Sequence, residues 1–424
     1  MRRLVAPKVA FLSLGFLLIV CCSPYQKGLM QAERHAYPAA IESFQQELIR
    51  HPEHWQARQQ LGYAYLKTGQ KAQAIQEFQR VLADRPGEPL STYYLGLAYL
   101  EEGHRSQALE TWKSYRNDQN SFSELELKRQ MTLVEFYDSI HLARQALAEE
   151  QKLQAVQPQS GSVAVFYFKD LSADHRFRHL QKAMATLIIT DLSQVKSLRV
   201  MERLKVQCLL SEMQLGETGI VDASTAPRTG RLLGAENLIV GSLESGSMTA
   251  RTTVASTQKQ DVIAAFYVRS ESDKFFTVEK MIVSSLVKVL KVPLTPEEEA
   301  RLAVHQTQNL KAVIFFGQGL EALDAGKWEQ AHKSFSDAAT EDPGFELAKR
   351  YRDGCPAASS ASIAGLAAMS NAALSDSVAA QMDGSFGGTG PAASQTSSGA
   401  GGSDPGAAPA PAPGPTGGNV GVVW

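Results

Sequence analysis

Two histidines, His175 and His179, stand at helical spacing in the segment HRFRH and raise the question of a metal site. Imidazole nitrogens ligate transition metals, and residues four apart share one face of a helix. Arg176 and Arg178 are interleaved with them, which favours a basic surface loop or the start of a helix. We therefore predict no metal ligand in this segment.

The consecutive glutamates at residues 297–299 are a second candidate for chemistry, as an acid–base pair. Thr295 as an N-cap and Pro296 at the first helical position precede them, which is typical of the first turn of a helix. The chain has neither a G-x-x-x-x-G-K-[ST] phosphate loop nor a G-x-S-x-G motif. The sequence thus predicts no catalytic, cofactor-binding or metal-binding residue, and we expect that the protein is not an enzyme.

Two further polar side chains are interpreted as structural. Arg203 ends the segment VMER and is expected to form an ion pair rather than to anchor a substrate. Cys208 lies in an apolar, periodic segment and is expected in a core. Beyond Cys21 and Cys22 the chain has only Cys208 and Cys355, so we predict no disulfide framework.

The N-terminal segment has the pattern of a secretory signal. Arg2, Arg3 and Lys8 precede an apolar run over residues 9–20. A membrane-spanning helix needs about 20 apolar residues, and this run is shorter. We therefore predict a signal peptide at residues 1–21.

The end of that signal, Ile19-Val20-Cys21-Cys22, resembles the lipobox of bacterial lipoproteins. Cys22 is the preferred lipid acceptor and Cys21 the alternative, because bulky Val20 would precede Cys21 where that family has a small residue. Ser23 then implies, by the same resemblance, an outer-membrane anchor that faces the periplasm. A secreted protein that is cleaved elsewhere is the remaining interpretation.

Chain length and net charge limit the number of domains and the class of partner. A chain of 424 residues has room for two or three domains, and its net charge of −2 does not favour nucleic acid as a partner.

A repeat of 34 residues occupies residues 22–120. Its period links Gly28, Gly62 and Gly96, and likewise Phe44, Phe78 and Trp112. The order of residues within one unit is similar to the tetratricopeptide repeat, which implies two antiparallel helices per unit. Such stacks form a concave groove that binds other proteins. We predict Gln59, Tyr63, Tyr93 and Leu97 as groove residues, with packing between helices as the alternative for each.

Residues 121–156 continue in helical periodicity without the repeat signature, and we predict a pair of capping helices. Residues 161–292 then alternate strands and helices and end in a hairpin and a helix, which indicates a mixed α/β sandwich. The segments VAVFYFKDLSAD and GRLLGAENLIVGSL resemble the curli-secretion lipoprotein family of the CsgG type. The pore-forming members of that family have longer amphipathic hairpins, so the resemblance argues against a conducting pore here.

The repeat pattern returns in residues 293–354, where Gly319, Phe335 and Pro343 are in register with one another. The earlier register is broken, so a single helical hairpin against the α/β domain is expected. Residues 355–424 are rich in Ala, Ser, Gly and Pro, and we predict a disordered tail.

Together these features predict a multidomain chain of α and α/β parts. By resemblance, it would be a lipid-anchored interaction scaffold in the assembly or export of bacterial cell-envelope components, with other proteins bound in the repeat groove. The alternatives are a subunit of a ring-forming secretion channel, which would be a homo-oligomer through the α/β domain, and a lipoprotein activator of a cell-wall synthase.

Overall fold

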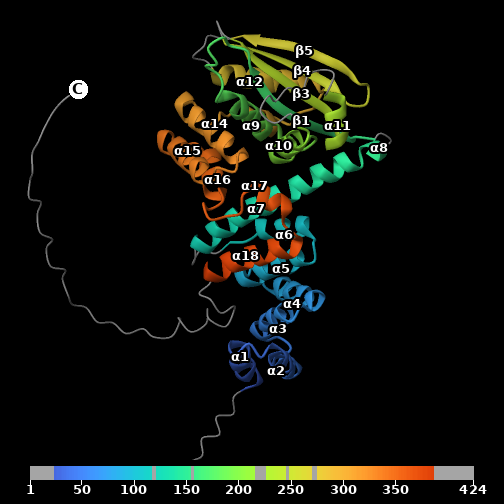
Figure 1. Ribbon diagram of the computed structural model, residues 1–424, viewed down its shortest axis with the longest axis vertical. Coiled ribbons are helices and arrows are strands. Elements are labelled where there is room, and N and C mark those ends of the chain that lie inside the picture. The colour runs from blue at the N-terminus through green and yellow to red at the C-terminus, as the bar shows by residue number, and fades with distance from the viewer. Residues whose placement is uncertain are drawn as a thin grey trace, which may run out of the picture.

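The computed structural model describes residues 23–116, 121–153, 157–214, 226–244, 248–269 and 275–385. Helical hairpins occupy one end of the molecule, a five-stranded sheet the other, and a long helix lies between them (Figure 1). The predicted class, helical repeats followed by a mixed α/β domain, is confirmed.

Three helical hairpins form the N-terminal array. They are α1 (Pro24–Glu33) with α2 (Tyr37–Arg50), α3 (Trp55–Lys67) with α4 (Lys71–Asp84), and α5 (Pro89–Glu101) with α6 (Arg105–Lys113). Gly69 and Gly103 end the first helix of the second and third hairpins at φ +75° and +84°, a conformation that side chains rarely adopt.

The repeat glycines exist because an aromatic ring lies against them. A Cβ added at Gly62 would lie 3.0 Å from the ring of Phe78, and one at Gly96 would lie 2.1 Å from the indole of Trp112. Trp112 is held in place, since it is buried and donates from Nε1 to the carbonyl oxygen of Tyr93 at 2.9 Å. The 34-residue period thus reflects a close contact inside each hairpin.

This contact predicts unequal effects at equivalent positions. Gly96→Ala is expected to lower the free energy of unfolding by about 1–3 kcal/mol, because the indole has no room to move. Gly62→Ala is the matched control and is expected to be close to neutral, since a small shift of Phe78 is offset by the better helix propensity of alanine, about 1 kcal/mol. Urea unfolding of the two variants measures the difference, and equal losses would contradict the explanation.

Residues 121–153 differ from the predicted pair of capping helices. They form one helix of 28 residues, α7 (Ser121–Ala148), followed by the single turn α8 (Glu150–Leu153). α7 contacts α6 of the array, α10 of the α/β domain and the C-terminal helices. The helix continues without a turn because other helices pack along it. A free-standing pair of helices would have to fold back on itself to bury its apolar residues, whereas α7 buries them against these neighbours.

The α/β domain contains one mixed sheet in the order β2-β1-β3-β4-β5. Its strands are β1 (Gln159–Asp170), β2 (Arg199–Val200), β3 (Ala235–Glu244), β4 (Thr249–Ser256) and β5 (Asp261–Arg269). β1 is parallel to β2 and β3, whereas β3, β4 and β5 are successively antiparallel. The predicted strands and the closing hairpin are therefore confirmed, and β5 forms an edge of the sheet.

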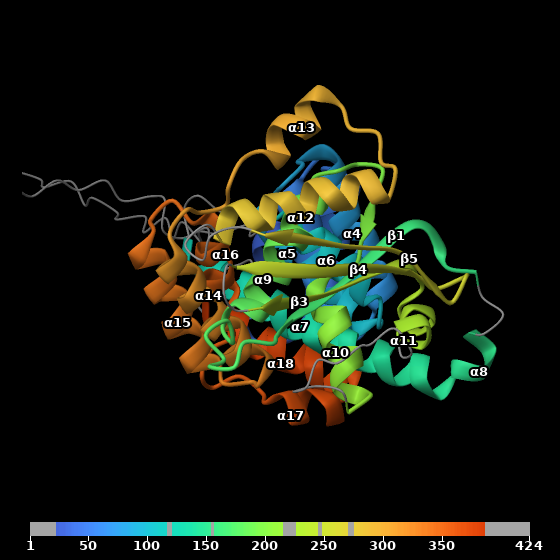
Figure 2. The same cartoon turned by 90° about the horizontal axis from the view of Figure 1, so that it is seen from above.

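Four helices cover this sheet. They are α9 (Leu180–Leu192), α10 (Arg203–Glu212), α11 (Ala226–Leu233) and α12 (Phe275–Val289). α9 packs along β1, and α12 lies along β4 and β5 (Figure 2). α11 is followed by Gly234, at φ +67°.

The fourth repeat follows α13 (Pro296–Leu302), which begins with the predicted cap at Thr295. It consists of α14 (Leu310–Asp324) and α15 (Trp328–Glu341), and α16 (Glu346–Gly354) packs on α15 and on α7. α14 lies against α9, which confirms a single hairpin against the α/β domain. A Cβ at Gly317 would lie 1.7 Å from the carbonyl oxygen of His179, so the two backbones touch there.

The predicted disordered tail is wrong for residues 355–385. Two helices, α17 (Ile363–Ala368) and α18 (Asn371–Ser385), fold back on α7, and α18 also contacts α5 (Figure 1). Leu366, Leu374, Val378 and Met382 are buried in these contacts. Alanine-rich composition suggested disorder, but one apolar side chain on α17 and three with helical spacing on α18 suffice to dock these helices. Residues 386–424 lie outside the described part of the chain.

None of the helices among the described residues combines the length and apolar character needed to cross a bilayer.

Candidate functional site

The four residues predicted to line the repeat groove are all buried. Gln59 and Tyr63 on α3 are 2 % and 6 % exposed, and Tyr93 and Leu97 on α5 are 0 % and 3 % exposed. Gln59 donates from Nε2 to Glu88 at 2.5 Å and to Ser91 at 3.0 Å, and Tyr63 packs edge-on against Tyr94. In this conformation they hold helices together, which was the alternative interpretation of each.

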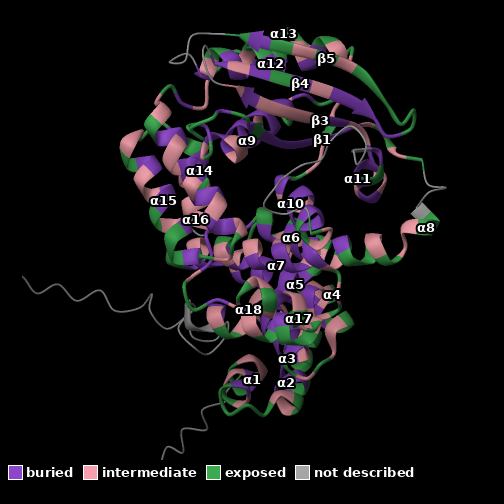
Figure 3. Cartoon of the chain, turned by 45° about the horizontal axis from the view of Figure 1, so that its top comes forward, coloured by how far each residue is buried: buried purple, intermediate pink, exposed green. Residues whose placement is uncertain are grey.

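The 34-residue period nevertheless defines one continuous face. The first helix of each hairpin carries three positions of this face, spaced four residues or about one turn apart. They are Tyr25, Leu29 and Glu33 on α1, Gln59, Tyr63 and Lys67 on α3, and Tyr93, Leu97 and Glu101 on α5. We call these nine positions the groove face. Its three α1 residues are half-buried or exposed and Lys67 is exposed, whereas Tyr93 and Leu97 are buried. Figure 3 shows the same trend along the array, with exposed and half-buried stretches on α1 and mainly buried ones on α5.

Helix α18 covers the α5 end of this face. Leu374, Val378 and Met382 recur every four residues along one side of α18 and are buried in the same core as Tyr93 and Leu97. Polar contacts tie both ends of α18 in place. Arg105 donates to Asn371 at 3.0 Å, and Gln130 donates to Gln381 at 2.6 Å.

A charge interaction also links α18 to the groove face. The pKa of Glu101 is raised chiefly by burial, and Asp376 on α18 raises it further by charge repulsion, although Lys71 opposes both effects. The groove face therefore has two parts, an open part formed by the three α1 positions and Lys67, and a part occupied by α18. No local feature of the sequence shows this, because α18 is about 280 residues distant along the chain.

A half-buried carboxyl group marks the junction between the array and the α/β domain. Glu135 on α7 lines a pocket with Glu110 and Lys113 of α6 and with Glu202 and Lys205 at the start of α10. Burial is the main cause that raises the pKa of Glu135 to about 7, and the nearby charge of Glu202 adds to it.

This pKa predicts that the junction weakens as the pH rises from mildly acidic to neutral. Glu135 is protonated in the folded chain below its raised pKa, whereas in the unfolded chain it ionises from about pH 4.5 upward. The stability therefore falls as the pH rises from about 4.5 to above 7, by roughly 1–3 kcal/mol. Glu135→Gln should leave the melting temperature nearly unchanged at pH 4.5 and raise it at pH 8. Equal shifts at both pH values would contradict this assignment.

The structure places the remaining candidates as follows. His179 contacts Glu321 on α14 at 3.1 Å, and His175 is exposed. Across the described ranges, no three His, Cys, Asp or Glu side chains are grouped to hold a metal ion. Cys208 is buried, and burial raises the pKa of its thiol to about 12, so its predicted core position is confirmed. Cys21 and Cys22 lie outside the described residues.

The predicted ion pair of Arg203 is confirmed. Its partner is Asp324, which the sequence alone did not identify. Asp324, at the end of α14, accepts from Arg203 at 2.8 and 3.0 Å and from Lys182 of α9 at 2.6 Å. Its side chain is 3 % exposed. Asp324 stands at an ordinary helix end in the sequence, so only the packing of α14 against α9 and α10 reveals its role.

Comparison with known proteins adds two family matches. The family model for the curli production assembly/transport component CsgG matches residues 145–254. A tetratricopeptide-repeat model matches residues 25–89 and 60–112. No curated protein sequence matches the chain.

Two solved structures show weak similarity. One is a tetratricopeptide repeat protein from Parabacteroides merdae ATCC 43184, 12 % identical, with 78 % of this chain and 97 % of that chain covered and a TM-score of 0.25. The other is yeast Tom70, 11 % identical, with 86 % and 68 % covered and a TM-score of 0.26. TM-scores this low do not establish a common overall fold. The two family matches and the observed elements agree: residues 25–112 form tetratricopeptide repeats, and residues 145–254 resemble the CsgG family.

Proposed function

We propose that the protein is a lipid-anchored scaffold that binds other proteins at the open part of the groove face, in assembly or export at the bacterial outer membrane. The observation that supports binding is the isolation of the first two hairpins. Every substantial contact of α1 to α4 is with another helix of the array, so this end projects away from the rest of the chain (Figure 1). Its exposed positions on the groove face, Glu33 and Lys67, are accessible to a partner.

The position of α1 supports anchoring close to the membrane. α1 begins at Pro24, and the side chain of Ser23 caps it by accepting from the backbone N–H of Gln26 at 3.2 Å. A lipid on Cys22 would therefore be one residue from the first repeat, with no flexible stalk. Two or more acyl chains give a stable anchor, whereas a single chain holds only marginally.

The anchor is tested by substitution of either cysteine. Cys22→Ser is expected to release the protein from the membrane fraction, and Cys21→Ser, the matched control, is expected to leave it there. Fractionation, with mass spectrometry of the N-terminal peptide, measures both. Release by Cys21→Ser alone would show that Cys21 carries the lipid. Membrane binding by both variants would contradict lipid anchoring.

Binding at the groove face is tested by capture of partners from the native membrane. Leu29→Glu with Lys67→Glu changes two positions of the open part, and Lys333→Glu on α15 is the control, since Lys333 is 77 % exposed and lies in the fourth repeat. Loss of the same captured proteins in the double variant alone supports the scaffold. Unchanged capture would refute it.

One observation favours a homo-oligomer through the α/β domain as the second candidate. The edge strand β5 exposes Val262, Ile263 and Tyr267 at 39 %, 40 % and 72 %. An unpaired edge with exposed apolar side chains is a template for strand pairing between chains. The mass of the detergent-extracted protein from light scattering separates the candidates, because a ring predicts one large fixed species and a scaffold predicts a monomer or small oligomer.

A further inference from the structure

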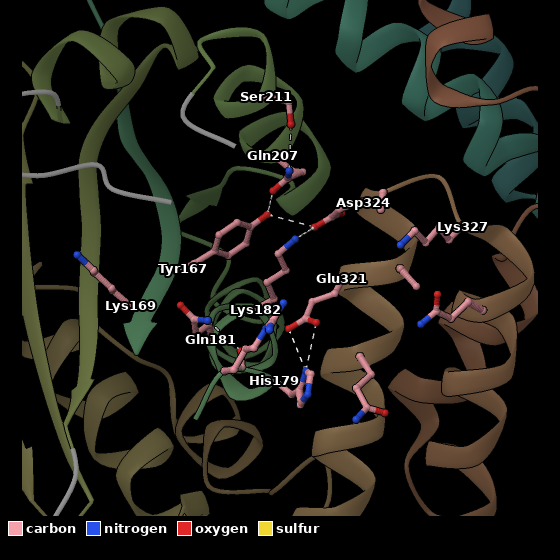
Figure 4. A pocket seen from close by; sticks show the side chains of 15 residues that line it. Tyr167, Lys169, His179, Gln181, Lys182, Gln207, Ser211, Glu321, Asp324 and Lys327 are labelled. Carbon is pink, nitrogen blue, oxygen red and sulfur yellow. Dashed lines mark hydrogen bonds and ion pairs between the residues drawn. The ribbon is translucent and has the colours of Figure 1, made fainter. Parts of the chain in front are cut away.

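A cavity of about 720 Å³ lies between the α/β domain and the fourth repeat. Its walls come from the end of β1, the segment before α9, the second half of α10, and the α14–α15 hairpin. Figure 4 shows Tyr167, Lys182 and Asp324 converging at one side of it. Small-molecule sites typically enclose about 300–1,000 Å³, so its size suits a metabolite-sized ligand.

The topology of the sheet places this cavity where α/β proteins bind ligands. β1 has β2 on one side and β3 on the other, both parallel to it, so the order of parallel strands reverses at β1. α9 follows β1 and α10 follows β2, and both line the cavity near the carboxyl end of β1. In open α/β sheets this crevice is the usual ligand site.

The carboxylates of the cavity are already engaged. Asp324 accepts hydrogen bonds from Arg203 and Lys182, and the hydroxyl of Tyr167 lies 3.4 Å from it. Glu321 contacts the imidazole of His179 at 3.1 and 3.2 Å (Figure 4). One carboxylate is thus shared by two cations at the floor, which leaves that cluster with a net positive charge. Arg203 is 6 % exposed, and its Nε–H has no acceptor among the described residues.

Unpaired cations complete the site. Four cationic side chains line the cavity against two carboxylates. Arg178, from the segment before α9, and Lys327, from the α14–α15 turn, are exposed, and no carboxylate in the described part of the chain pairs with either. Gln318 adds an amide donor. Gln181 and Gln207 each keep one N–H beyond the hydrogen bonds that they donate to the carbonyl oxygen of Arg178 and to Ser211. In a chain of net charge −2, this local surplus of donors and positive charge favours a ligand that only accepts hydrogen bonds.

From these observations we infer that the cavity binds a small anion with two or more negatively charged groups, phosphate or carboxylate. Arg178 and Lys327 hold the anion from opposite elements, while the Asp324 cluster forms the floor. Because the ligand touches both the β1–α9 segment and the fourth repeat, it stabilises their contact. The inference is independent of the groove face and of the lipid anchor.

Calorimetric titration of the detergent-extracted full chain with pyrophosphate and, separately, with citrate tests the inference at constant ionic strength. Saturable binding of at least one probe is expected, with a higher melting temperature at saturation. Tighter binding of pyrophosphate indicates a phosphate ligand, and tighter binding of citrate a carboxylate ligand. Failure of both probes to bind would overturn the inference.

Charge reversal locates the binding. Arg178→Glu and Lys327→Glu, singly and together, are expected to weaken binding at least tenfold in the double variant, while Lys333→Glu, an exposed lysine of the same hairpin, leaves it unchanged. Both target side chains are exposed, so the melting temperature without ligand should stay near that of the wild type. Equal weakening by Lys333→Glu, or full binding by the double variant, would overturn the site. Partner capture at the groove face is unaffected in either case, which keeps the two proposals distinguishable.

Discussion

Asp324→Ala is expected to lower the free energy of unfolding by about 3–5 kcal/mol, because it leaves the buried guanidinium of Arg203 and the half-buried ammonium of Lys182 without their counter-ion. Asp324 accepts from Arg203 and Lys182 within 3.0 Å, and the side chains are 3 %, 6 % and 18 % exposed. The three residues belong to α14, α10 and α9, so the loss falls on the contact between the fourth repeat and the α/β domain. Chemical denaturation should show a lower midpoint.

Asp337→Ala is the matched control for this prediction. Asp337 pairs with Lys333 at 3.0 Å on the surface of α15, where the side chains are 40 % and 77 % exposed. Exposed pairs contribute about 0–1 kcal/mol, so this variant should unfold almost like the wild type. Arg203→Met combined with Asp324→Leu should recover part of the loss, since apolar replacements remove the buried charges altogether. Equal effects of the two aspartate variants would contradict the burial of the cluster.

Val378→Asp is expected to detach α18 and to open the covered part of the groove face. Val378 is 1 % exposed between Leu374 and Met382, and an unpaired carboxylate there costs several kcal/mol. That exceeds what one short helix gains by docking, so α18 should leave while the array stays folded. Hydrogen exchange in α5 should rise, and proteolysis after residue 354 should become faster.

The same variant should bind partners more tightly if they use the whole groove. While α18 is docked, only the fraction of molecules in which it has come off can bind a partner along the whole groove. Removal of α18 raises the apparent affinity by the inverse of that fraction, about tenfold or more when α18 is docked most of the time. Ala380→Asp is the control, because Ala380 lies on the exposed side of the same helix. Unchanged exchange in α5 upon Val378→Asp would show that α18 does not cover the groove face.

Residue spacing predicts the array and the sheet well because both follow from local rules. Gly62 and Phe78 recur with the period of the hairpin, and the strands and helices of the α/β domain alternate in the order that the structure shows. α7 and α18 are different, since each is stabilised by segments distant in the chain. The apolar spacing of Leu374, Val378 and Met382 was present in the sequence, but alanine-rich composition obscured it.

The candidate site was harder to predict for the same reason. Equivalent positions such as Tyr63 and Leu97 mark the groove face, yet their burial depends on neighbouring repeats and on α18. The partner of Arg203 lies 121 residues away, on a helix that reads as an ordinary repeat. Periodicity identifies which residues share a face, whereas only tertiary packing decides which of them remain accessible.

A photo-crosslinking amino acid placed singly at Lys67 and at Ile263 in living cells tests the central proposal most directly. Lys67 lies on the open part of the groove face, and Ile263 on the exposed edge strand β5. The scaffold predicts that position 67 joins the chain to a different protein and that position 263 gives no product. Self-crosslinks at position 263 without any product at position 67 would contradict it and support assembly through the α/β domain.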